Sequence, residues 1–159
     1  MTASVSNSHA SFKLRGPWDH KAAEAYLDST TIPLRLACTA ADGFPRVVSL
    51  WYRYAEGHFY CVTHKDSKLT VLLKNNGKVG FEVSPNEPPY HGVRGQGLVT
   101  LHTDGGEEIL KQHLQRYLGG TNSSLARWLL SRAQEELVVR VEVVRMFSWD
   151  YRERMANSA

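Results

Sequence analysis

Cysteine is scarce in this sequence: Cys38 and Cys61 are the only two among 159 residues. Both lie inside strand-like apolar runs, and neither has the closely spaced cysteine or histidine partners that a zinc site requires. The sequence therefore predicts two buried thiols in a reducing compartment, rather than a disulfide framework or a metal centre.

Long hydrophobic runs and a strong excess of one charge are also absent. No apolar run approaches the roughly 20 residues that a membrane helix needs, and residues 1–9 lack the apolar centre of a signal peptide. The formal net charge is only +3 without a basic tract, so charge gives no reason to expect nucleic acid. We therefore expect a cytoplasmic protein with no membrane or nucleic-acid partner. Aromatic residues in predicted strands, such as Tyr52, Tyr54 and Tyr60, leave binding of single-stranded nucleic acid as a weaker alternative.

The length and the hydrophobic content of 42% fit one domain with a core of its own. We expect a flexible N-terminal tail over residues 1–16, which are rich in polar residues, and a single domain over residues 17–155. Apolar spacing between Trp18 and Leu27 predicts a short helix at the start of that domain.

Strand signals then follow one another. Residues 34–39 alternate between apolar and more polar side chains, and the Asp42-Gly43 pair predicts a hairpin to a strand over residues 45–54. Turn residues separate that strand from residues 58–63, which predict a return strand. The first three strands would therefore form a meander.

The second half of the chain continues the sheet. Residues 78–83, the glycine-spaced residues 90–99 and residues 137–144 predict further strands. Apolar stripes at helical spacing predict packing helices over residues 109–117 and 125–129, and we expect the histidine of the first stripe to be packed rather than a ligand. Roughly six antiparallel strands without crossover helices predict a mainly β fold, a small barrel with peripheral helices.

A corner that suits anions lies where a helix opens near Asp66. The first free N–H groups of that helix, the hydroxyls of Thr63 and Ser67 and the ammonium groups of Lys65 and Lys68 are expected to lie close together. The simpler alternative is an ordinary capped helix with surface lysines.

The order of these features resembles the pyridoxamine 5′-phosphate oxidase-like family, the FMN-binding split barrels. The matching features are an early Arg46 in a strand, a second strand that ends at Thr63, and a helix start at Ser67-Lys68. The resemblance extends from Ile32 to about Trp149. It implies an antiparallel split β-barrel that binds FMN, with F420 as an alternative and haem as a less favoured one.

The resemblance also implies cofactor roles for ten residues. Arg46 would reach the FMN phosphate and residues 47–49 would line the isoalloxazine edge, while the helix start grips the phosphate. Lys65 would share the phosphate because its loop is one residue shorter than in the oxidase. Trp149 would contact the flavin across a subunit boundary, with core packing as an equal alternative. The predicted set is Arg46, Val47, Val48, Ser49, Val62, Thr63, Lys65, Ser67, Lys68 and Trp149.

The C-terminal segment argues against vitamin B6 oxidation, because residues 150–154 do not reproduce the basic segment that grips substrate in the oxidase. What the resemblance then implies is a flavin-dependent oxidoreductase that passes hydride through N5 to a small molecule, or a flavin- or haem-binding carrier or sensor without turnover. No nucleophile, base or metal-ligand constellation is recognisable, so catalytic residues stay unassigned.

Split barrels of this family build cofactor sites between two subunits, so the resemblance implies a homodimer. The strand aromatics Trp51, Tyr52 and Tyr54 give modest support, because they place rings on both faces of one strand and a small barrel has little interior for all of them.

Overall fold

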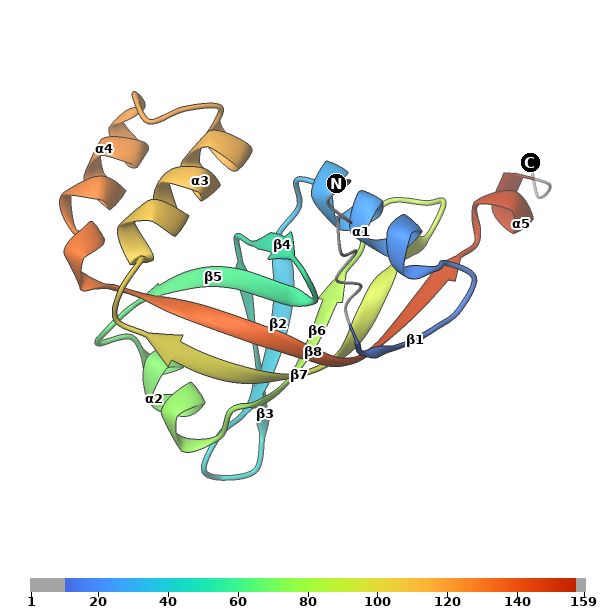
Figure 1. The fold of residues 1–159 in the computed structure, drawn as a ribbon, viewed down its shortest axis with the longest axis horizontal. Coiled ribbons are helices and arrows are strands. Elements are labelled where there is room, and N and C mark those ends of the chain that lie inside the picture. Colours follow the sequence, from blue (N-terminus) through green and yellow to red (C-terminus); the bar gives the residue numbers. More distant parts are fainter. Residues whose placement is uncertain (1–10, 157–159) are drawn as a thin grey trace, which may run out of the picture.

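The computed structural model describes residues 11–156 as a curled sheet of eight strands with helices around it (Figure 1). The strands are β1 (Lys13–Arg15), β2 (Leu34–Thr39), β3 (Pro45–Leu50), β4 (Arg53–Ala55), β5 (His58–His64), β6 (Lys78–Val83), β7 (His91–His102) and β8 (Glu136–Asp150). The helices are α1 (His20–Ser29), α2 (Lys68–Asn75), α3 (Gly106–Leu118), α4 (Ser124–Ser131) and α5 (Arg152–Ala156), with a 3₁₀ turn at Ala133–Glu135.

The sheet closes on itself as a barrel with a split. Its strand order is β3-β2-β6-β7-β8-β5-β4, and β1 adds to β8 as a parallel partner. The two end strands, β3 and β4, are separated in the chain only by Trp51 and Tyr52. The sheet must therefore curl until its two edges meet, and the predicted mainly β, antiparallel split barrel with peripheral helices is confirmed.

Side chains that alternate inward fill the barrel. In β2 the inward residues are Leu34, Leu36 and Cys38, as the alternation predicted, and neither Cys38 nor Cys61 forms a disulfide. Helix α1 packs on the barrel through Ala23 and Leu27 at the top of Figure 1, and α2 packs through two leucines at the bottom. Apolar side chains of α1 and α2 thus cover the two ends of the barrel.

The predicted single strand over residues 45–54 is wrong. It breaks at Tyr52, whose side chain turns into the core, where its hydroxyl donates to Leu27 O at 2.9 Å and Thr30 O at 3.2 Å. Because of this break β3 pairs only with β2, while β5 pairs with β4 and β8. Both predicted hairpins, β2–β3 and β4–β5, therefore form, but β3 and β5 do not pair, so the three predicted strands do not make one continuous meander.

The predicted flexible tail over residues 1–16 needs a correction at its end. Residues 1–10 lie outside the described residues, but Lys13, Leu14 and Arg15 form β1 and pair with Arg145, Met146 and Phe147 of β8. The structured domain therefore begins before residue 17.

A second apolar layer lies outside the barrel under α3 and α4. Leu110, Leu114, Ala126 and Ala133 form its buried cluster, and the side chains of Trp51 and Val62 pack against it. No helix between residues 11 and 156 is both long and apolar enough to cross a bilayer.

The aromatic residues that were expected at an interface are packed within the chain. Trp51 stacks on Tyr117 with ring centroids 5.2 Å apart, Tyr52 is fully buried, and Tyr54 contacts Phe59 at 5.0 Å. They therefore no longer support a dimer.

His113 is a packed residue, as predicted. It is fully buried on α3, and its Nε2 donates to Tyr60 O at 3.0 Å. Burial lowers the pKa of His113 to about 4, so the ring is neutral at physiological pH.

Candidate functional site

A hollow of about 930 Å³ lies on the outer face of the sheet, where β2, β6, β7, β8 and β1 run side by side. Cross-strand pairing sets its lining, because paired residues point to the same face. One row of pairs runs Arg35, Glu82, Arg94, Phe147, Arg15, and the next runs Ala37, Gly80, Gln96, Arg145, Lys13.

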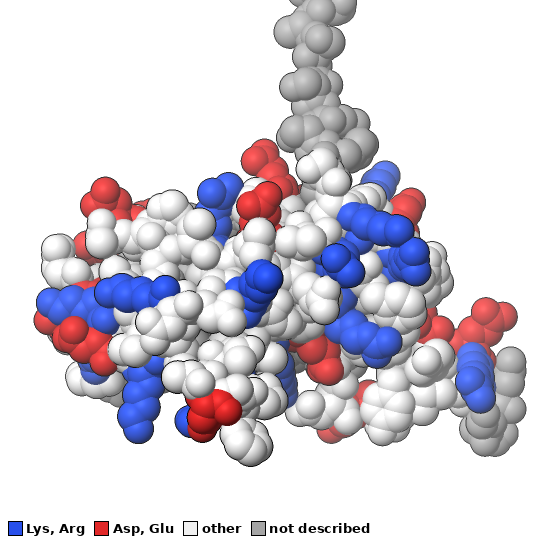
Figure 2. All heavy atoms as spheres, turned by 90° about the horizontal axis from the view of Figure 1, so that it is seen from below, with Lys and Arg blue, Asp and Glu red and all other residues white. Residues whose placement is uncertain are grey.

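The hollow is strongly cationic. Figure 2 shows Lys and Arg side chains gathered right of centre, with Asp and Glu mostly around them, on the side where Figure 1 places β1 and the end of β8. Within residues 11–156 none of the hollow's five cations forms an ion pair, and Glu82 is its only carboxylate. The positive potential is therefore available to an anionic ligand. The five cations are Lys13, Arg15, Arg35, Arg94 and Arg145.

The floor of the hollow is made of small residues. A Cβ added to Gly80 would lie 3.7 Å from Ala37 Cβ and from Gly95 O, which is ordinary contact, so no protein atom requires glycine there. At Gly95, by contrast, a Cβ would lie 2.2 Å from Arg145 O. Gly95 is thus needed for strand packing, whereas Gly80 and Ala37 leave room for a flat molecule.

Apolar side chains also reach this face. Val47 is 67% exposed and lines the hollow, and Phe147 is 39% exposed beneath the guanidinium of Arg94, at 4.8 Å from its ring centroid. The hollow therefore offers hydrophobic contact as well as charge.

The four predicted residues of β3 divide between the two faces of that edge strand. Val47 lies opposite Ala37 and Ser49 opposite Arg35, so both share the face of the hollow. Val48 packs against the barrel core. Arg46 lies opposite the buried Cys38, on the other face from the hollow.

The α2 corner exists as predicted, but its hydroxyls are already used. Ser67 caps the helix by accepting from Thr70 N at 3.1 Å, and it also bonds Thr63 Oγ1 at 2.9 Å. Thr70 Oγ1 donates to His64 O, so a chain of donors from Thr63 through Ser67 to Thr70 consumes all three hydroxyl protons. The simpler alternative, an ordinary capped helix, therefore explains the position of Ser67.

The two lysines of the corner differ. Lys65 Nζ lies 3.5 Å from Glu135 Oε1, and His64 Nε2 donates to the same carboxylate at 2.8 Å, which lowers the pKa of Glu135. Lys68 is exposed and forms no ion pair in the described chain. Of the corner's cations, Lys68 is the one available to a ligand.

The remaining predicted residues lie apart. Val62 is partly buried and packs against the apolar cluster under α3 and α4. Trp149 stands on the same face of β8 as Phe147, with the Arg94 guanidinium 5.4 Å from its ring. The structure thus brings Val47, Ser49 and Trp149 to the face of the hollow and leaves the helix start as a separate group.

The cations of the hollow are the residues that sequence reasoning missed as a group. Alternation in β2 and β8 places Arg35 and Arg145 on an outer face. Their convergence depends on pairing between Lys13 and Arg145, which are far apart in the chain.

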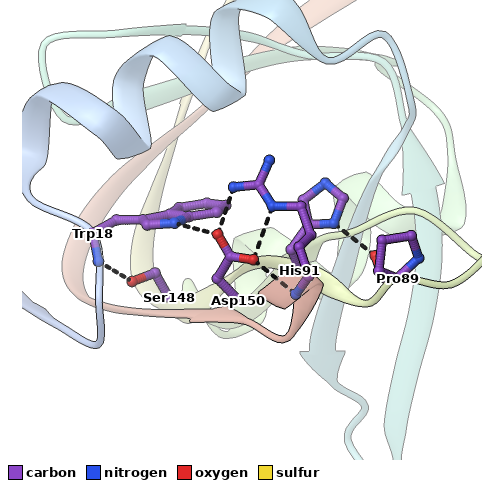
Figure 3. Close-up of polar contacts among 6 residues, drawn as sticks. Trp18, Pro89, His91, Ser148 and Asp150 are labelled. Carbon is purple, nitrogen blue, oxygen red and sulfur yellow. Dashed lines mark hydrogen bonds and ion pairs between the residues drawn. The ribbon is translucent and has the colours of Figure 1, made fainter. Parts of the chain in front are cut away.

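A hydrogen-bonded cluster fixes the C-terminal end of β8 (Figure 3). Trp18 Nε1 donates to Asp150 Oδ2 at 3.2 Å, and Arg152 Nε donates to Asp150 Oδ1 at 2.8 Å. The Arg152 guanidinium holds the pKa of Asp150 well below its usual range. Beside them His91 Nδ1 donates to Pro89 O at 2.8 Å. The Arg152 guanidinium is thus paired with the Asp150 carboxylate of the same chain.

Comparisons with known proteins give the fold. No protein-family model matches the sequence, and no curated protein matches it. The conserved hypothetical protein Rv2991 from Mycobacterium tuberculosis matches in structure with a TM-score of 0.74 and 20% identity, over 87% of this chain and 89% of that one. An F420 reductase matches with 0.66 and 18% identity, over 77% and 94%.

Further structures match at lower similarity. A candidate pyridoxamine 5′-phosphate oxidase from Listeria innocua has a TM-score of 0.59 and 17% identity, over 77% of this chain and 90% of that one. An FAD-binding protein from Mesorhizobium loti and the haem storage protein HutZ from Vibrio cholerae have TM-scores of 0.59 and 0.58. The chain therefore shares the split-barrel fold of these structures.

Proposed function

We propose that this protein is an oxidoreductase that binds FMN, with F420 as the alternative cofactor, against the cationic hollow and the adjoining face of β3. The observation that carries the proposal is the hollow itself: five cations, free of ion pairs within the described residues, surround a floor of small residues. A flat, anionic, largely apolar molecule fits such a lining.

Particular residues would hold the cofactor. The ring would rest on Gly80 and Ala37 and against Val47, and the cations would hold the acidic groups. Arg46 and Lys68, which were predicted to bind the cofactor phosphate, lie on parts of the surface outside the hollow. We propose a homodimer in which these two side chains of one copy and the hollow of the other hold one cofactor.

One observation favours F420 as a second candidate. FMN carries a single phosphate ester, and one or two charge-assisted contacts satisfy it. F420 carries a phosphodiester and carboxylates, and the hollow holds five cations against one carboxylate. The excess of cations fits the more highly charged cofactor.

When bound, either cofactor supplies hydride transfer to a small-molecule substrate. The chain's residues would bind and orient the ring, and the two buried thiols fit the cytoplasmic setting that we propose. A haem carrier is less well supported, because no His, Cys or Tyr between residues 11 and 156 lines the hollow to ligate iron.

Calorimetry of the purified protein with FMN and with F420 tests the proposal, together with the absorption spectrum of any ligand that heat releases. Gly80→Leu, whose Cβ would meet Ala37 and Gly95 only at ordinary contact distance, should occupy the floor and weaken binding by more than about tenfold, an effect comparable to the loss of one charge-assisted bond. Thr100→Leu, an exposed change in β7 outside the hollow, is the matched control. Uptake of neither cofactor, or equal binding by both variants, would contradict the proposal.

A further inference from the structure

A second cavity of about 690 Å³ lies between the sheet and the N-terminal half of α3. It shares no residue with the cationic hollow and contains none of the ten predicted cofactor residues. Arg53, Tyr60 and Arg140 line it from the sheet, and Glu108 and Gln112 line it from α3. It is therefore a separate candidate site.

Its sheet wall is a tyrosine between two arginines. Arg53 pairs with Tyr60 and Tyr60 pairs with Arg140 across three neighbouring strands, so the three side chains share one face. The Arg53 guanidinium lies 4.8 Å from the centre of the Tyr60 ring. Neither arginine forms an ion pair with any residue between 11 and 156.

Arg140 is held in place by a neutral group. Its Nη2 donates to His58 Nε2 at 2.9 Å, and His58 Nδ1 donates to Glu56 O at 2.8 Å. This arrangement requires the neutral imidazole, because both of its nitrogens are then used, one as acceptor and one as donor. The guanidinium keeps its other donors for a ligand.

Two buried polar atoms at this cavity lack partners among the described residues. They are Arg53 Nε, a donor, and Gln112 Oε1, an acceptor. The Gln112 amide is oriented by its Nε2, which donates to Glu108 Oε1 at 3.4 Å. Buried donors and acceptors in folded proteins are nearly always paired, and a ligand that both accepts and donates would satisfy this pair of opposite character.

The charge of the lining points the same way. Two arginines face two carboxylates, those of Asp104 and Glu108, whereas the cationic hollow has five cations to one carboxylate. A balanced lining favours a molecule with both charges over a polyanion. We propose that this cavity binds a small zwitterion of the amino acid class, with its carboxylate toward Arg53 and Arg140 and its ammonium toward Gln112 Oε1 and Glu108.

Protein-detected NMR tests the proposal on the full chain, with L-alanine and L-phenylalanine as probes and with acetate and ethylamine as single-charge controls. We expect an amino acid to shift the Arg53 Nε–H signal and the Gln112 side-chain amide signals saturably at concentrations up to about 10 mM, so that every variant keeps one reporter. Arg53→Gln and Arg140→Gln should each weaken binding by about tenfold or more. Arg127→Gln, at an exposed position on α4 outside both cavities, is the matched control and should bind normally.

Gln112→Met provides a second test that keeps both arginines. It removes the unpaired acceptor at similar size and should also weaken binding. Three results would each overturn the proposal. The first is that neither L-alanine nor L-phenylalanine shifts the signals, and the second is that acetate binds as tightly as the amino acids. The third is that Arg140→Gln and Gln112→Met bind the amino acids as tightly as the wild type. Cofactor binding does not enter these measurements, so they stand independently of the proposed oxidoreductase function.

Discussion

The buried neutral His113 should make the stability of this protein depend on pH. Its ring has no exposed surface, and burial together with the charges of Arg116 and Arg53 lowers its pKa to about 4. In the unfolded chain the same histidine has its ordinary pKa of about 6.5. Between these two values the unfolded state binds more protons than the folded state.

The sign follows from this difference in proton binding. Where the unfolded state binds more protons, the free energy of unfolding rises with pH. The stabilisation is therefore complete above about pH 6.5 and is lost as the pH falls toward 4. Each pH unit between the two pKa values is worth about 1.4 kcal/mol, which gives a total of about 3 kcal/mol. About 2 kcal/mol of this should be lost between pH 7.5 and pH 5.

Urea denaturation at pH 7.5 and pH 5, on the wild type and on His113→Gln, measures this contribution. Glutamine can still donate to Tyr60 O but does not titrate. The variant should be less stable at pH 7.5, because it loses ring packing, yet should lose about 2 kcal/mol less than the wild type on going to pH 5. His102→Gln, at an exposed position, controls for the loss of a histidine.

Identical pH dependence in the wild type and His113→Gln would refute this reasoning. It would mean that the ring takes up its proton in the folded state as easily as in water. A shift of equal size in His102→Gln would likewise assign the effect to the general loss of a titrating group.

Three further outcomes are expected. Ser67→Ala should lower the free energy of unfolding by about 1 kcal/mol through loss of the α2 cap, measured by urea denaturation against the exposed Ser124→Ala; equal stabilities would contradict the cap. Gly95→Ala should lower the free energy of unfolding by about 3 kcal/mol or more, because its Cβ would lie 2.2 Å from Arg145 O. Gly80→Ala should unfold at nearly the same urea concentration as the wild type. Burial raises the pKa of the Cys61 thiol, which should label with a thiol reagent only after unfolding; rapid labelling of folded protein would show that the thiol is accessible.

Local chemistry in the sequence determined much of the secondary structure. Alternation placed Leu34, Leu36 and Cys38 on one face of β2, and Ser67 was recognisable at the start of α2. Apolar residues at helical spacing located α3. These features depend on neighbours within a few residues, so the sequence by itself was sufficient to predict a mainly β barrel with peripheral helices.

The tertiary structure alone decided which strands meet. Residues 45–54 look like one strand because each residue favours extended backbone, yet burial of the Tyr52 ring breaks it and sends β3 and β4 to opposite edges. The cationic hollow likewise exists only because Lys13 pairs with Arg145 and Arg35 pairs with Glu82. Such pairings join segments distant in the chain and are selected by the packing of the whole core, which no local pattern encodes.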